Sequence, residues 1–467
     1  MIADLKPYAE YKASGLPWLD DVPKHWDMVP NRALMQDQRQ VVGENAADYT
    51  LLSLTLRGII PRDMDNPKGK FPAQFNTYKV VKPEDLVFCL FDIDETPRGV
   101  GHSKLNGMIT GAYDVFTPRG SVNPRFLYLY YFFVDEGKLL KPLYTGLRKT
   151  IQRGVFASLK APFPPPAEQA AIVRFLDWAN GRMERAIRAK LKVIALLNEQ
   201  KQAIIRRAVT RGLDPSVPLK PSGIPWLGEI PQHWDFRAFA RLARVVRGAS
   251  PRPAGDKRFF YGDHIPWLTV GEVTKDNGIY LTRTETSLTK LGEEKSVRFP
   301  AGTLVLTNSG ATLGVPKVLS VDVCANDGIV AFLRLNSIVD PVFAYYYLST
   351  LTHRLRDELR QGGTQPNLNT GIVRVIACPL PPKFEQLAIL TFLESELSGV
   401  QTAISRLERE IELLREYRTR LVADVVTGKF DVREAAVHLP EEAAPDTAEH
   451  DADMSDETEP ADEEVIV

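Results

Sequence analysis

The chain contains few cysteines and no long apolar run. Its three cysteines, Cys89, Cys324 and Cys378, lie far apart and have no metal-ligand spacing, so we expect neither a disulfide framework nor a zinc module. No apolar stretch approaches the ~18 residues of a membrane-spanning helix. The first residues, MIADLKPYAE, lack the basic and apolar segments of a signal peptide. These absences predict a cytoplasmic protein without a membrane partner.

The sequence also lacks the motifs of common catalytic sites. It has no GxxxxGK[ST] phosphate loop, no HExxH pair, no paired CxxC, no nucleophile elbow and no Asn-Pro-Pro-Tyr string. His25 and His233 recur in a PxHWD element, but their Trp, Pro and Asp companions favour a structural clamp. Asp92, Asp94 and Glu95 imitate a nuclease cluster, yet acidic residues in such a segment are more often turn formers. The sequence therefore predicts a chain without catalytic residues.

Positive charge is nearly absent from the C-terminal end of the chain and abundant elsewhere. From residue 434 onward there are thirteen Asp and Glu residues and no Lys or Arg. The first 433 residues keep 58 basic against 46 acidic side chains, a net charge of +12. Such a split indicates a polyanionic partner for the basic part. The acidic segment over 433–467 has few large apolar residues, so we expect it to be disordered.

The chain contains two copies of one module. Residues 14–27, SGLPWLDDVPKHWD, return at 222–235 as SGIPWLGEIPQHWD, with nine identities in fourteen positions. Residues 163–176, FPPPAEQAAIVRFL, return at 380–393 as LPPKFEQLAILTFL. A spacing of more than 200 residues is too long for a solenoid repeat and matches a domain plus its connector. The sequence therefore predicts a duplicated domain.

Each copy combines a strand-rich front with a long helix. The runs TLLSLTLRGII, DLVFCLF, GDHIPWLTVGEV, GTLVLTNSG and GIVAFLRL predict strands, and helices are expected over 123–140 and 340–360, capped by Asn123 and Asp340. Heptads of apolar residues then run over 168–211 and 385–427. Helices of this length, about 65 Å at 1.5 Å per residue, exceed what a small globular core can cover. We expect the two helices to pair antiparallel.

Basic and polar residues gather in the fronts of the two modules, where the copies differ. Lys and Arg supply phosphate affinity, and Arg, Asn and Gln read bases in the major groove. Each residue alone is an ordinary surface group, but the set favours DNA contact. The candidates are Arg57, Lys68, Lys70, Lys79, Arg98, Lys104, Arg148, Lys149, Arg153, Arg247, Arg252, Lys257, Arg258, Thr307, Asn308, Ser309, Lys317, Thr364, Gln365, Asn367 and Asn369.

These motifs together resemble the specificity subunit of type I restriction–modification systems. The resemblance covers about residues 8–433. It rests on PPxxEQ at both helix starts, the helix ends AVTRGLD (208–214) and VVTGKFDVR (425–433), IPWLTVGEV (265–273), TQPNLN (364–369) and the repeated SGxPWLxxxPxHWD. The first module departs from the pattern, with LRKTIQ (147–152) in place of TQPNLN and no IPW-like element.

The resemblance implies an α+β fold with two similar α/β target-recognition domains, separated by two long antiparallel helices that form a coiled coil with pseudo-twofold symmetry. The implied domains are a first reader (1–163), a first spacer helix (164–212), a second reader (213–380), a second spacer helix (381–432) and the acidic tail (433–467). Each reader would recognise one half of a split site in double-stranded DNA.

The resemblance also implies the partners. Two methyltransferase (modification) subunits would dock on the helices, at Glu168, Gln169, Glu385 and Gln386, and restriction/translocase subunits would join for cleavage. S-adenosylmethionine, ATP and Mg²⁺ would belong to those partners, with no cofactor or metal in this chain. Two alternatives stay open from the residues alone: a non-catalytic coiled-coil scaffold that never reads DNA, and a stand-alone nuclease or methyltransferase.

Overall fold

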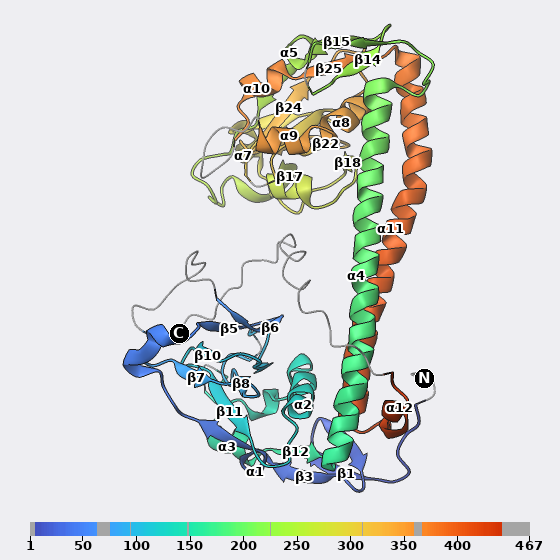
Figure 1. The fold of residues 1–467 in the computed structure, drawn as a ribbon. Helices are drawn as coiled ribbons and strands as arrows, with labels where there is room; N and C mark the ends of the chain where they lie inside the picture. Colours follow the sequence, from blue (N-terminus) through green and yellow to red (C-terminus); the bar gives the residue numbers. More distant parts are fainter. Residues whose placement is uncertain are drawn as a thin grey trace. The chain divides into compact units, whose positions relative to one another are not determined.

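The computed structural model describes most of the chain, in two compact units (Figure 1). The described residues are 5–62, 75–93, 95–146, 149–224, 226–310, 312–358 and 367–440. Unit 1 comprises Met1–Ala189 with Arg409–Val467, and unit 2 comprises Lys190–Glu408. Two long helices, α4 (Pro166–Arg211) and α11 (Lys383–Val426), contribute to both units. They begin and end within a few residues of the heptad segments in the sequence.

Unit 1 is built on an antiparallel sheet with the strand order β4-β11-β8-β9. Its strands are β4 (Met35–Gln38), β11 (Asp114–Pro118), β8 (Leu86–Phe88) and β9 (Val100–His102). Two-stranded pairs surround this sheet: β1 (Tyr11–Leu16) with β2 (Leu19–Pro23), β3 (Asp27–Pro30) with β12 (Lys160–Phe163), β5 (Leu52–Thr55) with β6 (Gly58–Pro61), and β7 (Lys79–Val81) with β10 (Gly107–Ile109).

Helix α2 (Pro124–Glu136) packs against β9 and carries much of the core of unit 1. The Asn123 side chain accepts hydrogen bonds from the backbone N–H groups of Arg125 and Phe126, and Pro124 occupies the first turn. The predicted cap is therefore confirmed, although the helix ends four residues before the expected Leu140. Two short helices, α1 (Asn31–Leu34) and α3 (Arg153–Ser158), complete the globular part. Phe126, Tyr130 and Tyr131 are almost completely buried.

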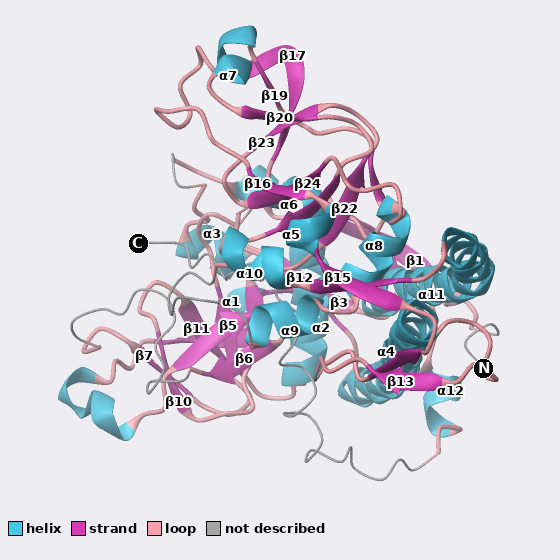
Figure 2. Ribbon diagram, turned by 90° about the horizontal axis from the view of Figure 1, so that it is seen from above, coloured by secondary structure: helices cyan, strands magenta, loops and turns pink. Residues whose placement is uncertain are grey.

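Unit 2 contains a five-stranded and a four-stranded sheet (Figure 2). The first has the order β16-β24-β21-β22-β18, with β16 (Arg244–Arg247), β24 (Ile329–Leu333), β21 (Leu304–Thr307), β22 (Pro316–Leu319) and β18 (Tyr280–Leu281). The second has the order β19-β17-β23-β20, with β19 (Ser287–Leu288), β17 (Phe260–Leu268), β23 (Val323–Ala325) and β20 (Val297–Phe299). Smaller pairs join β13 (Leu219–Pro221) to β14 (Glu229–Pro231) and β15 (Asp235–Ala238) to β25 (Ala377–Leu380).

Two of the secondary-structure predictions for unit 2 need correction. The expected helix over 340–360 is two helices, α8 (Pro341–Ser349) and α9 (Thr352–Asp357), because the chain leaves helical hydrogen bonding near Leu351. The expected strand over 262–273 ends at Leu268, and its last residues form helix α6 (Val270–Thr274), which Thr269 caps. The other short helices are α5 (Phe239–Leu242), α7 (Lys290–Glu294) and α10 (Thr370–Val375).

The expectation of a disordered tail from residue 433 is wrong for its first residues. Arg433–Val437 form helix α12, and Ala436 and Leu439 are buried in the core of unit 1. Apolar side chains in 432–439 belong to the same core cluster as residues of α4. The acidic composition of the whole segment gave no sign of this packing. Residues 441–467 lie outside the described residues. Among the residues that are described, no helix is both long and apolar enough to cross a membrane.

Candidate nucleic-acid interface

A buried carboxylate joins the repeated sequence motifs of unit 1. Glu168, in the first turn of α4, is 4% exposed. Its carboxylate accepts hydrogen bonds from Tyr8 Oη at 2.6 Å and Trp26 Nε1 at 2.8 Å, and its Oε2 lies 2.8 Å from His25 Nε2. Burial first, and then the hydrogen bond to Glu168, raise the pKa of Tyr8 well above its ordinary value, so this phenol keeps its proton. We call this set the clamp of unit 1.

Unit 2 contains a corresponding clamp around Glu385, in the first turn of α11. Trp234 Nε1 donates to Glu385 Oε2 at 2.9 Å, and His233 Nε2 lies 2.6 Å from Oε1. The Glu385 side chain is 25% exposed, and the sequence has Ser216 at the position that corresponds to Tyr8. The prediction that the histidines of the PxHWD elements are structural is confirmed in both units. A helix start thereby fixes the module that precedes it.

The glutamine that follows each clamp glutamate forms a hydrogen bond at the start of a second helix, α2 in unit 1 and α8 in unit 2. Gln169 Oε1 accepts from the backbone N–H of Asn123, and Gln386 Oε1 accepts from that of Asp340, each at 2.8 Å. The Nε2 groups donate to the carbonyls of Pro164 and Pro381. Both glutamines are fully buried. The EQ pair therefore binds the long helix to the residue that caps α2 or α8.

These contacts correct the predicted docking residues. Glu168, Gln169 and Gln386 use their polar atoms inside their own unit and expose almost no surface, so we do not retain them as partner contacts. Glu385 keeps some exposure, but both carboxylate oxygens are engaged by the clamp. The EQ pair of each motif therefore positions the start of its long helix.

Several of the predicted contact residues lie at the ends of strands in the five-stranded sheet of unit 2. Arg247 at the end of β16 pairs with Val330 in β24, and Thr307 at the end of β21 pairs with Ile329. The exposed Arg247 donates from Nε to the carbonyl of Asp327, whose carboxylate accepts from Ser250 at 2.8 Å. The Ser250 hydrogen bond and nearby arginines lower the pKa of Asp327, which stays ionised. Arg247 is thereby oriented by its own unit.

The segment 367–369 lies beside the end of β21. The Leu368 N–H donates to the Asn308 carbonyl at 2.8 Å, and Ser309 and Asn367 form a β-bridge. The Asn308 amide, almost fully buried, approaches Asn367 Oδ1 at 3.4 Å, and exposed Asn369 caps α10. The structure therefore brings the TNSG turn and the end of TQPNLN together, as sequence alone did not. Thr364 and Gln365 lie outside the described residues.

Three further basic residues of unit 2 lie in the loop between β16 and β17. Arg252, Lys257 and Arg258 are exposed. Arg258 pairs with Asp256 at 2.6 Å and lies over the Phe259 ring at 5.6 Å. A guanidinium stacked on a ring is held in one orientation, which suits contact with a phosphate or a base. This loop adds exposed positive charge to unit 2.

Lys317 and Thr307 do not fit the predicted DNA surface. Lys317 is 1% exposed, and its ammonium donates to the Asp276 carboxylate and to the carbonyls of Asp276 and Gly278, at 3.1 and 2.6 Å for the carbonyls. Thr307 is fully buried and donates to the Thr312 carbonyl. Both side chains bind loops in the interior of unit 2, and Asn308 is just as deeply buried, so we remove all three from the contact set.

Lys317→Met and Lys257→Met should separate these two roles. Losing the buried ammonium is expected to lower the free energy of unfolding by about 2–3 kcal/mol, because two carbonyls and a carboxylate lose a charged donor. Replacing exposed Lys257 should change stability by less than ~0.5 kcal/mol. Urea unfolding gives the first readout. In a DNA titration at several salt concentrations, only Lys257→Met should reduce the salt slope, by ~1. A large loss of stability in Lys257→Met together with a reduced salt slope in Lys317→Met would contradict the burial of Lys317 and the exposure of Lys257.

In unit 1, Asp114 at the start of the inner strand β11 binds two of the predicted basic residues. Its carboxylate accepts from Lys79 Nζ at 3.0 Å and from Arg153 at 2.6 Å. Lys79 is buried, whereas the Arg153 side chain remains 55% exposed. The Ile151 N–H donates to the Leu90 carbonyl at 2.8 Å, as Leu368 donates to Asn308 in unit 2. The LRKTIQ segment thus ends in the same backbone arrangement as TQPNLN, despite its different residues.

The remaining candidates of unit 1 divide by burial. Arg98 is buried, pairs with Glu136 at 2.7 Å and lies over the Phe132 ring, so it fixes the end of α2 and leaves the contact set together with Lys79. Arg57 and Lys104 are exposed, and Lys149 is half-buried with Glu95 at 3.6 Å. Lys68, Lys70 and Arg148 lie outside the described residues.

Sequence reasoning missed the acidic residues that orient these cations. Asp114, Asp276 and Asp327 each bind a predicted basic residue from a distant part of the chain. No local pattern marks them, because a pairing between two loops exists only after the sheet has formed. The only signal was indirect: each lies next to a turn or a strand end.

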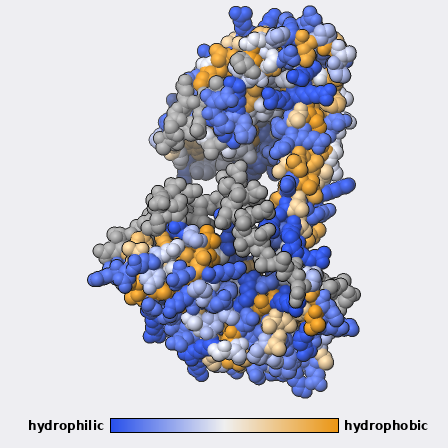
Figure 3. All heavy atoms as spheres, in the orientation of Figure 1, coloured by the Kyte–Doolittle hydropathy of each residue, from blue (hydrophilic) through white to orange (hydrophobic). Residues whose placement is uncertain are grey.

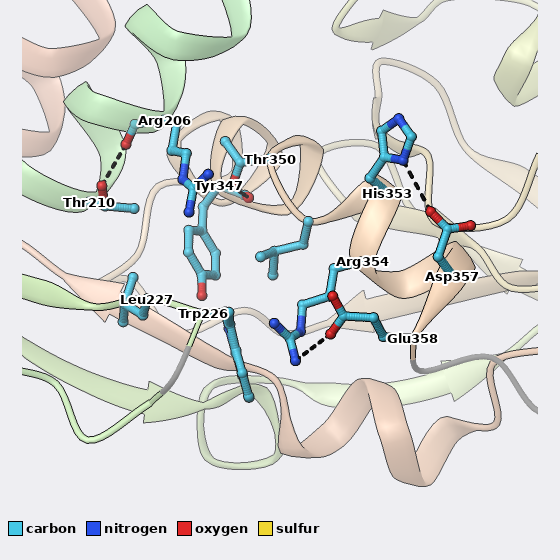
Figure 4. A pocket seen from close by; sticks show the side chains of 11 residues that line it. Arg206, Thr210, Trp226, Leu227, Tyr347, Thr350, His353, Arg354, Asp357 and Glu358 are labelled. Atoms are coloured by element: carbon cyan, nitrogen blue, oxygen red, sulfur yellow. Dashed lines mark hydrogen bonds and ion pairs between the residues drawn. The ribbon is translucent and has the colours of Figure 1, made fainter.

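A pocket of about 360 Å³ lies in unit 2 between the end of α4, the turn at Trp226 and helices α8 and α9 (Figure 4). Inside it the Arg354 guanidinium lies 4.5 Å from the centroid of the Trp226 ring and pairs with Glu358 at 2.6 Å. Both of its acidic groups are paired within the pocket, because Asp357 also lies 3.1 Å from His353. Within the described ranges no cluster of His, Cys, Asp and Glu has the geometry to hold a metal ion.

Comparison with known proteins gives consistent relatives. Residues 231–414 match the model of the type I restriction modification DNA specificity domain. The type I restriction enzyme MjaIX specificity subunit of Methanocaldococcus jannaschii is 29% identical over 170 residues, 36% of this chain and 38% of that protein. The putative MjaX specificity subunit of the same organism is 23% identical over 292 residues, 61% of this chain and 63% of that protein. These alignments span less than two thirds of either relative.

A solved structure shares the fold over most of the chain. It is described as "Structural basis underlying complex assembly and conformational transition of the type I R-M system". The match has a TM-score of 0.61 and 15% identity, and it covers 87% of this chain and 98% of that one. The mixed helix and strand content and the long helix α4 are therefore features of a known architecture.

Proposed function

We propose, for a chain whose residues 231–414 belong to the family of type I restriction modification DNA specificity domains, that it is the specificity subunit of a type I restriction–modification complex. It reads a bipartite site in double-stranded DNA and directs adenine methylation or restriction by partner subunits. Two of the relatives that it matches are named as specificity subunits.

The single observation that carries the proposal is the repeated clamp in two units whose charged loops differ. Glu168 and Glu385 hold the same motif in the two units, with the same partners on Trp and His side chains. Elsewhere in each unit, Asp114 with Arg153 in unit 1 and Asp327 with Arg247 in unit 2 present different charged groups. A common frame that carries two different surfaces is what recognition of two unlike half-sites requires.

The long helices supply the spacer in this proposal. Glu184 of α4 pairs with Arg418 of α11 at 3.0 Å within unit 1, and Lys201 of α4 donates to Gln401 of α11 at 3.0 Å within unit 2. Partners that advance along one helix and recede along the other support an antiparallel coiled coil with pseudo-twofold symmetry. The length of this pair would set the gap between the half-sites.

Catalysis in the proposed complex belongs to other subunits. Two modification subunits would bind S-adenosylmethionine and transfer its methyl group, and restriction subunits would use ATP and Mg²⁺ for translocation and cleavage. The pairing of His25 with Glu168 and of His233 with Glu385 supports a structural rather than a catalytic use of these histidines in the proposed complex.

Binding to a defined bipartite sequence tests the proposal. Methylation-sensitive sequencing of the host genome yields the split motif, and the chain assembled with its modification subunits is then titrated with that site and with random DNA. The specific site should bind at least ~10³-fold more tightly, with a steep salt dependence. Equal affinity for both DNAs would favour a scaffold, and methyl transfer or cleavage by the chain alone would favour an enzyme.

A further inference from the structure

The first residues of β17 expose an aromatic ring on a strained backbone. Tyr261 is 73% exposed, and its φ of 62° lies in the left-handed region, which a bulky residue rarely adopts. Phe260 and Ile265 both pair with Leu288 of β19, so the residues between them form a bulge. A bulge turns a side chain out of the regular alternation of a strand. Tyr261 therefore presents its ring to solvent in a backbone conformation that is unfavourable by itself.

Neighbouring segments hold the backbone on both sides of Tyr261. The Thr289 N–H donates to the Phe259 carbonyl at 3.0 Å, and the Thr289 hydroxyl donates to the Arg258 carbonyl at 2.7 Å. A Cβ on Gly262 would lie only 2.6 Å from the Thr289 backbone nitrogen, so this glycine permits the close approach of the two segments. The exposed ring is therefore carried by a fixed backbone. Strain that a fold maintains in this way is typical of a functional position.

The exposed side chains next to Tyr261 in the sequence are charged. Lys257 and Arg258 precede it, and the Arg258 guanidinium lies over the Phe259 ring at 5.6 Å. Cations bind phosphates and an aromatic ring stacks on bases, so this combination suits a nucleic acid. Asp263, also exposed, repels a phosphate at the ring and can accept a hydrogen bond from a cytosine amino group. The ring is therefore placed for a base, and the two cations for phosphates beside it.

The surface around Tyr261 is separate from the long helices. Thr289 caps α7, which packs against β17, and in both ribbon views α7 lies at the end of unit 2 away from α4 (Figures 1 and 2). Figure 3 shows that hydrophobic side chains reach the surface along the long helices. An apolar protein partner requires a contiguous apolar patch, whereas the chain around Tyr261 exposes charged residues. These observations favour DNA over a protein as the partner of Tyr261.

We propose that Tyr261 is a wedge that stacks on a base in the half-site read by unit 2, at a base step that its ring opens, while Lys257 and Arg258 bind the flanking phosphates. This inference rests on the proposed function, which supplies the DNA. Side chains that insert between base pairs unstack one step and kink the duplex, and stacking on the ring offsets part of that cost. The wedge thereby adds stacking and deformation of the DNA to the hydrogen bonds that read base edges.

Binding of the bipartite site by the chain assembled with its modification subunits tests the wedge. Tyr261→Ala should weaken binding at least fivefold, because base–aromatic stacking is lost, and should leave the salt slope unchanged, because no phosphate contact is removed. Tyr261→Phe keeps the ring and should stay within twofold of wild type. Tyr280→Ala is the matched control, since Tyr280 is 51% exposed in β18 of the same unit, and should also bind like wild type. A smaller loss in Tyr261→Ala would overturn the proposal.

Tyr261→Gly separates the ring from the backbone that carries it. Glycine adopts a positive φ without strain, so this variant should unfold at a higher urea concentration than Tyr261→Ala and should bind the site equally weakly. Wild-type affinity in Tyr261→Gly would show that the ring makes no contact with DNA, and would also overturn the proposal.

Abasic nucleotides locate the stacked base. Each nucleotide of both half-sites is replaced in turn, and the affinities of wild type and Tyr261→Ala are compared. At one position the effect of the replacement should differ between the two proteins by at least fivefold, as expected for two groups in contact. Equal effects at every position would contradict the wedge. So would a dimer of the chain, or binding of a modification subunit, that Tyr261→Ala abolishes, because the ring would then belong to a protein contact.

The same titrations distinguish failure of the wedge from failure of the proposed function. A wild-type complex that binds its bipartite site and random DNA equally would mean that the proposed function fails. A wild-type complex that prefers its site, together with a Tyr261→Ala complex of the same affinity, would mean that only the wedge fails.

Discussion

Removal of seven residues from each long helix is expected to shorten the DNA gap that the complex recognises by about three base pairs. The residues are taken between Glu184 and Lys201 on α4 and between Gln401 and Arg418 on α11, so that both interhelical contacts stay. Seven residues shorten a helix by about 10 Å, and base pairs are spaced ~3.4 Å apart. Affinity for the original site should fall at least ~10³-fold, to the level of non-specific DNA.

The new optimum should bind less tightly than the original one. A heptad rotates the helix ends by only about 20°, whereas three base pairs rotate the half-sites by roughly 100°. A selection from a library of half-sites with every gap length measures the optimum directly. Deletion from α4 alone is the control: it removes the pairing register and should lower helix stability. An unchanged gap in the double deletion would show that the helices do not set the spacing.

Glu168→Ala is expected to destabilise unit 1 by about 3–5 kcal/mol, the largest effect of any single substitution in the clamps. The change leaves Tyr8, Trp26 and His25 without their shared acceptor, and each buried polar group without a partner costs about 1–3 kcal/mol. Urea unfolding followed by tryptophan fluorescence measures the loss, because Trp26 is fully buried beside the carboxylate.

Glu385→Ala is the matched substitution in unit 2. It removes the acceptor of two side chains, and Glu385 is already 25% exposed, so water replaces part of the lost hydrogen bonding. A loss of about 1–3 kcal/mol is expected. Equal losses in the two units would show that the Tyr8 hydrogen bond and the deeper burial of Glu168 contribute nothing. Glu168→Gln should fall between wild type and Glu168→Ala, since its amide oxygen keeps one acceptor.

Much of the architecture followed from local patterns. The heptads located α4 and α11, Asn123 and Asp340 marked the starts of α2 and α8, and alternation of β-branched and turn residues found β5, β8, β21 and β24. Each of these signals is short-range, because it depends on side chains a few residues apart on one element. The break between α8 and α9 and the docking of α12 depend on contacts with other elements, and they were missed.

The candidate site was less predictable than the fold. Composition predicted a basic contact surface in the variable loops, but Lys79, Arg98 and Lys317 proved to be buried partners of Asp114, Glu136 and Asp276. The sequence does not distinguish a lysine or arginine that is exposed to solvent from one that is buried beside a carboxylate of a distant segment. Burial depends on which loops meet, and that is set by the strand order of the sheets.

The sequence by itself determined that this protein is a duplication, that each copy ends in a long amphipathic helix, and that its basic charge lies outside the C-terminal segment. These properties follow from residue periodicities and residue counts, which can be read without a structure. Only the tertiary structure decided what the repeated residues do: the His, Trp and Glu of the two motifs meet across more than 140 positions of chain. It also decided that Ala436 and Leu439, next to an acidic segment, are buried in the core of unit 1. Hydrogen bonds and apolar contacts between distant segments form only when the chain has folded, so no local pattern encodes them.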